Sequence, residues 1–222
     1  MRPQSSEFMK DVQELSRHGS PGGRPQPLAF HGETLWIGSW DTSSLYAIDT
    51  KTWSVLDEVA APGKPYGLAS FEGALRAVIS IGEDEDRYFY TFVPGQGFDA
   101  KSKIECPERT GSHLTSDGSV LYLVQSTFGR ILKLDAAGTV LREIPMPSRC
   151  GGASYAAGTF HIISADAEFD VLEFATLDIE LPRPTLAPVA AMAPEARGLA
   201  FDGTTWWTNY RELNEIVSFA AP

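Results

Sequence analysis

Short apolar segments of about five residues, separated by glycine or Asx turns, recur along the whole chain. Typical examples are Leu45–Asp49, Tyr88–Phe92 and Ile131–Asp135. Alternating apolar segments bounded by turn residues predict antiparallel hairpins. Helical periodicity is nearly absent, and the stretch Phe8–Leu15 is the only weak candidate. The pattern therefore predicts an all-β protein.

The predicted strands fall into five units that repeat the same order. Each unit opens on a small-apolar strand, at positions 28, 68, 114, 153 and 199, so the repeat is roughly 40–45 residues long. An aromatic-rich second strand and a third strand follow, and a fourth strand is visible in Val55–Val59 and Val140–Ile144. Four antiparallel strands in about 40–45 residues are typical of a β-propeller blade. We therefore predict a five-bladed β-propeller of four-stranded antiparallel blades, at about 27–63, 65–107, 111–147, 150–194 and 196–222.

The fifth unit ends at Pro222 after three strands, so its fourth strand must come from elsewhere. Near the N-terminus, Val12–Leu15 matches the fourth-strand pattern of Leu56–Val59. We expect residues 9–16 to form the outer strand of the last blade, which would close a single domain spanning 1–222 without an open seam. A disordered or helical N-terminus is the alternative.

Several segments resemble repeats of known propellers. Gly198–Trp207 and Leu45–Thr52 look like repeats of the broad NHL/YVTN group, and Gly129–Val140 resembles repeats of streptogramin lyases and glutamine cyclotransferases. The resemblance covers nearly the whole chain and implies the propeller fold. It does not specify a function, because one fold supports many activities. Propellers of this group often have six or seven blades, whereas this chain has five units.

Composition excludes several classes of function. A net charge of −11 argues against DNA or RNA binding, which depends on cations that neutralise phosphates, and it disfavours anionic membrane surfaces. No apolar run reaches the ~18–20 residues of a membrane-spanning helix. The two cysteines, Cys106 and Cys150, are too few for a disulfide framework, and no secretory signal is visible. We expect a cytoplasmic protein, although a mature exported form would look the same.

A basic residue follows a proline shortly before each unit opens. In propellers of the resembled group, these loops and those between the second and third strands surround the channel mouth and hold the ligand. The basic residues are Arg24, Lys64, Arg109, Arg149 and Arg197. Such a ring of cations would attract a small anionic or polar molecule, or an acidic protein segment. The alternative is structural: the cations pair with carboxylates of neighbouring blades or bond strand-end carbonyls.

Other candidate site residues are scattered over the predicted loops. Aromatic side chains suited to wall a pocket are Trp40, Tyr66, Phe128 and Tyr210, although each is also suited to packing between blades. His113 precedes a strand opener and is the histidine we place nearest the channel. Lactonase-like propellers hold a channel metal with acidic and amide side chains, and Asp166 and Asn209 would supply part of such a set. No spacing identifies further ligands, so we assign no metal or cofactor.

Two functions from different classes remain. The first is a protein that binds a small anionic or polar ligand, or a partner's acidic segment, over the basic channel mouth. The second is an enzyme of the lactonase, lyase or cyclotransferase type acting in the same pocket. The enzyme would need a bound divalent metal or a carboxylate–histidine pair in the channel. Catalytic residues and oligomeric state are not assigned by the sequence.

Overall fold

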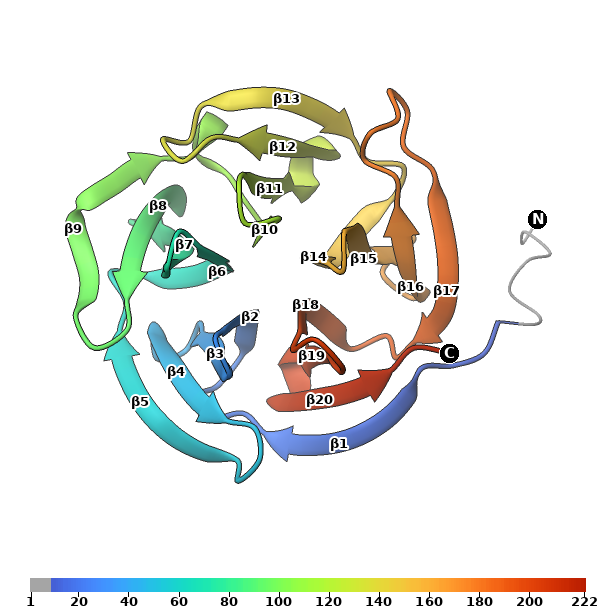
Figure 1. Ribbon diagram of the computed structural model, residues 1–222, viewed down its shortest axis with the longest axis horizontal. Helices are drawn as coiled ribbons and strands as arrows, with labels where there is room; N and C mark the ends of the chain where they lie inside the picture. The colour runs from blue at the N-terminus through green and yellow to red at the C-terminus, as the bar shows by residue number, and fades with distance from the viewer. Residues whose placement is uncertain (1–8) are drawn as a thin grey trace.

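A computed structural model describes residues 9–222, which form five four-stranded antiparallel sheets arranged in a ring (Figure 1). The predicted all-β, five-bladed propeller is confirmed. Three one-turn 3-10 segments lie between strands: η2 (Pro107–Arg109), η3 (Ser126–Phe128) and η4 (Arg211–Leu213). Within residues 9–222, no helix is long and apolar enough to cross a membrane.

The first three blades each use four consecutive strands, ordered from the centre of the ring outward. Blade 1 consists of β2 (Pro25–His31), β3 (Thr34–Ser39), β4 (Ser44–Asp49) and β5 (Ser54–Ala60). Blade 2 consists of β6 (Lys64–Phe71), β7 (Ala74–Ile81), β8 (Asp86–Val93) and β9 (Gly97–Glu105). Blade 3 consists of β10 (His113–Ser116), β11 (Leu121–Gln125), β12 (Arg130–Leu134) and β13 (Val140–Pro145).

Blade 4 is built like the first three blades, and blade 5 takes its outer strand from the other end of the chain. Blade 4 is consecutive: β14 (Arg149–Ala156), β15 (Thr159–Ala165), β16 (Leu172–Leu177) and β17 (Leu186–Met192). Blade 5 takes β18 (Ala196–Phe201), β19 (Trp206–Tyr210) and β20 (Glu215–Ala220) from the C-terminus and β1 (Gln13–Gly19) from the N-terminus. The two ends of the chain therefore share one sheet (Figure 1).

Closure by the N-terminal strand is confirmed, with a shift in its position. β1 pairs antiparallel with β20 from Gln13 opposite Ala220 to Gly19 opposite Glu215, rather than over 9–16. The segment before it bonds to blade 4 instead: Val12 N donates to Ala191 O, and Ala191 N donates to Lys10 O, both at 3.0 Å. The strand starts later because this segment first follows β17 of blade 4. Residues 1–8, part of the predicted domain, lie outside the described residues.

Apolar clusters between neighbouring blades hold the ring together. Along β3, Leu35 and Ile37 belong to the cluster shared with blade 5, which contains Trp207. Trp36, between them in sequence, belongs to the cluster shared with blade 2. Successive side chains on a strand point to opposite faces, so each blade buries both of its faces. This explains why most residues of the second strands are buried, on both faces of the sheet.

Glycines let the inner strands approach one another closely at the centre. A Cβ atom on Gly152 would lie 2.6 Å from the carbonyl carbon of Gly198, and one on Gly67 would lie 2.8 Å from Leu114 N. Neither position has room for a side chain, because the obstacle is backbone that cannot move aside. The close approach narrows the centre of the ring.

Removing residues 1–19 should destabilise the protein strongly. The truncation leaves β20 as an unpaired edge and removes backbone hydrogen bonds that contribute about 0.5–1.5 kcal/mol each. A loss of about 3 kcal/mol or more would lower Tm by about 10 °C in a chain of this size. Differential scanning calorimetry measures the change.

Removal of residues 1–8 alone is the matched control, because it ends before the pairing at Lys10. Its Tm should stay within about 2 °C of the full chain. If the longer truncation were equally harmless, β1 would not be what closes the ring.

Candidate functional site

One end of the ring, which we call the mouth face, gathers two sets of loops. These are the connections that lead into the inner strands β2, β6, β10, β14 and β18, and the loops between the second and third strands of each blade. Backbone hydrogen bonds join the two sets: Trp40 N donates to Arg24 O, and Met146 N donates to Gly129 O. Residues far apart in sequence are thereby placed on one surface.

The channel beneath the mouth is narrow. A layer formed by Leu28, Leu68, Leu114, Ala153 and Leu199 separates a neck of about 10 Å³ from a lower cavity of about 120 Å³. The neck has room for about one water molecule. A hollow of this size does not hold a small organic molecule.

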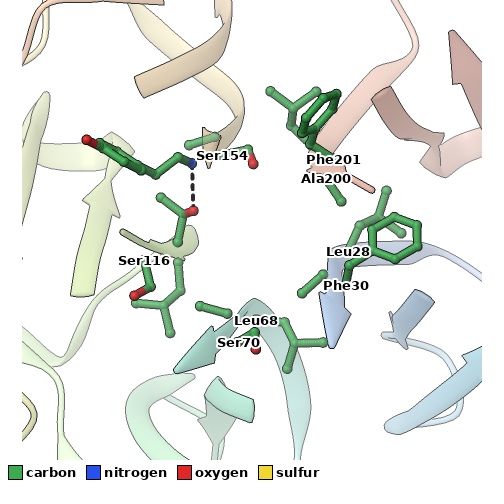
Figure 2. Close-up of a pocket in the computed structure, with 15 residues that line it drawn as sticks. Leu28, Phe30, Leu68, Ser70, Ser116, Ser154, Ala200 and Phe201 are labelled. Carbon is green, nitrogen blue, oxygen red and sulfur yellow. Dashed lines mark hydrogen bonds between the residues drawn. The ribbon is translucent and has the colours of Figure 1, made fainter. Parts of the chain in front are cut away.

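The lower cavity opens toward the opposite end of the inner strands. Figure 2 shows its ring of side chains, in which Leu28, Phe30 and Leu68 lie around the opening with the hydroxyl-bearing Ser70, Ser116 and Ser154 of the inner strands. Thr115 Oγ1 accepts a hydrogen bond from Tyr155 N across two blades at 2.8 Å. None of the candidate residues named from the sequence lines this cavity, so the site they suggest is at the mouth.

The five basic residues are not equivalent in the structure. Arg109 lies in η2, outside the inner strand, 3.1 Å from Glu105 and 3.4 Å from Asp86. Lys64 is the first residue of β6 and lies 2.9 Å from Glu85. Both side chains are about half exposed, and both are paired with carboxylates of blade 2. Arg109, which leads into blade 3, thus matches the structural alternative of pairing with a neighbouring blade.

The other three basic residues form no ion pair within residues 9–222. The Arg24 guanidinium lies 5.2 Å from the centre of the Trp40 ring. Those of Arg149 and Arg197 lie 5.8 and 5.1 Å from the centre of the Phe169 ring. These contacts hold the cations over aromatic rings without neutralising their charge.

Arg211, in η4, is a further mouth residue that the sequence analysis did not single out. Its guanidinium lies 4.7 Å from the centre of the Trp40 ring, and Nη1 donates to Gln26 Oε1 at 2.9 Å. Nε lies 3.1 Å from the carboxylate of the adjacent Glu212, which is largely exposed. The sequence could have indicated Arg211 by its place in the predicted loop between the second and third strands of blade 5.

Arg197 has an unfavourable electrostatic position. It is the second residue of β18, is partly buried, and its Nη1 donates to the carbonyls of Pro194 and Ala196. Burial and the positive charge of Arg211 lower the pKa of Arg197, and the charges of Glu212 and Glu195 offset part of this effect. A partly buried cation beside another cation is stabilised when an anion binds between or over them.

Two of the candidate aromatic residues line the mouth. Trp40 Nε1 donates to Pro65 O at 2.7 Å, and the Trp40 and Tyr66 rings lie 4.7 Å apart. Tyr66 lines the neck, donates its hydroxyl to Glu85 at 2.9 Å and lies under the Arg87 guanidinium at 3.6 Å. Burial raises the pKa of Tyr66, so its hydroxyl stays protonated at neutral pH.

Tyr210 and Phe128 lie in other surroundings. Tyr210 is buried in the cluster between blades 4 and 5, with the Arg17 guanidinium 5.1 Å from its ring. It serves blade packing, the alternative use that the sequence left open. Phe128 is 53% exposed at the end of η3, beside the connection from blade 3 to blade 4.

Asp166 and Asn209, the two residues suggested as metal ligands, each form hydrogen bonds with backbone groups. Asp166 Oδ1 accepts hydrogen bonds from Asp170 N and Val171 N, which fixes its own loop. Asn209 is fully buried, and its Nδ2 donates to Gln26 O at 2.9 Å. Within residues 9–222, no group of three or more His, Cys, Asp or Glu side chains is arranged to hold a metal ion.

His113 lines the neck of the channel and is neutral. Burial, with the positive fields of Arg211 and Arg197, lowers its pKa from 6.5 to about 4. Cys150, on the neighbouring blade, is also buried, and its Sγ donates to Gly152 O at 3.2 Å. Burial raises the pKa of the Cys150 thiol to about 12, so it remains an unreactive thiol.

Comparison with known proteins shows the fold. No protein-family model and no curated protein matches this chain. A glutaminyl cyclase from Myxococcus xanthus superposes with a TM-score of 0.73 and 12% identity, over 97% of this chain and 98% of that one. A Bacteroides thetaiotaomicron protein of unknown function gives 0.61 and 13%, over 96% and 72%. A virginiamycin B lyase from Staphylococcus aureus gives 0.53 and 17%, over 88% and 66%.

These similarities confirm the resemblance to cyclotransferase and streptogramin-lyase propellers at the level of fold. At such low identity, similarity carries no information about substrate or reaction. Function must be argued from the side chains at the mouth.

Buried neutral His113 should make stability fall on acidification. Because its pKa is about 4 in the folded chain and 6.5 unfolded, only the unfolded chain binds this proton between those values. Its contribution is complete above pH 6.5 and is lost as the pH falls toward 4, a change on the order of 3 kcal/mol. We expect His113→Gln to flatten the decline of unfolding free energy with pH, measured by urea denaturation.

The slope between pH 4 and 6.5, rather than stability itself, is the readout, so a destabilised variant is still informative. Leu56→Ser, at an exposed position of β5, is the control because neither residue titrates, and it should keep the wild-type slope. An unchanged slope in His113→Gln would show that His113 titrates normally in the folded protein.

Proposed function

We propose that this protein binds a small anionic molecule, or the acidic end of a partner, on the mouth face. The observation that carries the proposal is the position of Arg197. Its side chain is partly buried, the charge of Arg211 lowers its pKa, and it has no ion pair within residues 9–222. The guanidiniums of Arg24, Arg149 and Arg197, which have no ion pair within residues 9–222, form a local positive site on a chain whose net charge is −11.

The surroundings of Arg197 suit an oxyanion. Arginine presents its donors in a planar fork that matches a carboxylate or phosphate. Trp40 and Tyr66 supply a rigid aromatic wall from blades 1 and 2, and Arg24 and Arg211 both lie against Trp40. Because the neck below has a volume of about 10 Å³, the ligand stays on the surface formed by these residues.

The proposal retains part of the basic ring expected from the sequence. Arg24, Arg149 and Arg197 are its anion-binding members. Arg211 is added to them because Glu212, its carboxylate partner, is largely exposed. Lys64 and Arg109 are less suited because each is paired with carboxylates that are more buried than Glu212. Nucleic acid remains an unsuitable partner on the same charge argument, since a few guanidiniums on an acidic protein neutralise few phosphates. We place the protein in the cytoplasm, in keeping with its two free, buried cysteines.

An enzyme acting at the mouth is the second candidate, and His113 is what favours it. A neutral imidazole at pH 7 is able to accept a proton, and His113 lies in the neck with Tyr66. Its depressed pKa makes it a weak base, however, and the neck is too small for a substrate atom to reach it without movement. Anion binding at the mouth needs no movement of the neck, whereas catalysis by His113 does, so binding is the function we favour.

Arg197→Gln should weaken the binding of inorganic phosphate and of propionate by about 10–100-fold, because a hydrogen bond to a charged group contributes roughly 1.5–3 kcal/mol. Arg211→Gln should have a similar effect. NMR titration of the labelled protein measures both affinities, and wild-type affinity should fall as salt concentration rises.

Arg183→Gln is the matched control, because this exposed arginine lies between β16 and β17, outside the mouth loops. It should bind both anions as the wild type does. The proposal is wrong if wild-type protein binds neither anion, or if the Arg197 and Arg211 variants bind them unchanged.

A further inference from the structure

A larger, open hollow, which we call the side groove, lies on the mouth face over blades 3 and 4. It is lined by Ser126–Gly129, Met146–Arg149 and Phe169 and has a volume of about 810 Å³. The first segment is the loop after β11, the second leads from β13 into β14, and Phe169 belongs to the loop after β15. All three are mouth-face loops of blades 3 and 4, and the volume is in the range of small-molecule sites.

The side groove offers apolar side chains to a ligand. Phe128 is 53% exposed, and Met146 and Phe169 are partly exposed beside it. The Arg130 guanidinium lies 5.0 Å from the Phe128 ring, but it is paired with Glu108 at 2.6 Å and Glu143 at 2.8 Å. The Phe128 end of the groove is therefore aromatic without a free charge, which suits an apolar group.

Phe169 connects the side groove with the anion site. Its ring is contacted by Arg149, which lines the groove, and by Arg197, which belongs to the mouth. Its backbone φ is +61°, in the left-handed region that non-glycine residues rarely adopt. The two hydrogen bonds accepted by Asp166 hold the loop in this conformation. The loop thus places an aromatic ring in contact with a cation of the side groove and a cation of the mouth.

We propose that the side groove is a subsite for the apolar part of an organic acid, whose anionic head is held by Arg197 at the mouth. This inference rests on the proposed function and extends it from anions in general to one chemical class. The ligand carries a carboxylate or phosphate head and a ring-sized apolar body. Head and body bind on opposite sides of Phe169, with Arg149 beside the path between them.

Two matched pairs of ligands test the proposal: propionate with 3-phenylpropionate, and inorganic phosphate with phenyl phosphate. In wild-type protein, the phenyl compound of at least one pair should bind about tenfold more tightly than the compound without the phenyl group. NMR titration measures the affinities. Phe128→Ser should remove this gain and leave the affinity for propionate and phosphate unchanged. The pair with the larger gain identifies the head group.

Leu56→Ser is the control, because Leu56 is 59% exposed on the outer strand β5, away from the groove. It should keep the full gain from the phenyl group. If propionate and phosphate bind through Arg197 but the phenyl group adds nothing, or Phe128→Ser keeps the gain, the subsite is wrong and the proposed function stands. If no anion binds, both are wrong.

Discussion

The structure depends on burying both faces of every blade between its neighbours. Alternate residues of β3 belong to two different clusters, one shared with blade 2 and one shared with blade 5. A four-stranded sheet with two apolar faces would expose one of them to water unless a neighbouring blade covered each face. The blades are therefore stable only as a closed ring. The cluster between blades 5 and 1 is the one that closes the ring.

Closure explains why the chain ends share one sheet. β1 covers the edge of β20, and the segment before it bonds to β17 of blade 4. The N-terminal segment therefore forms hydrogen bonds both within blade 5 and with blade 4. The same closed ring fixes the distances between the mouth loops, so side chains from separate blades form one rigid surface.

Among residues 9–222, the mouth surface carries both paired and unpaired cations. Lys64 and Arg109 are neutralised by carboxylates, as surface cations usually are. Arg197 lies partly buried near Arg211, and Phe169 adopts a left-handed backbone conformation between Arg149 and Arg197. Such local costs in stability are concentrated at binding sites in many proteins, because the surrounding fold compensates for them. The proposed organic acid would relieve the electrostatic cost by binding.

The sequence by itself determined the strands, the number of blades and the origin of the closing strand, because alternation and turn residues act locally and each repeat shows them again. It also located the loops of the mouth face. Only the tertiary structure decided which side chains meet there. Arg197 lies inside its inner strand, β18. Arg109 lies in η2, before the inner strand β10, and is paired there with carboxylates of blade 2. Tyr210 turns into the core and Arg211 faces the mouth because partners on other blades, distant in sequence, determine their surroundings.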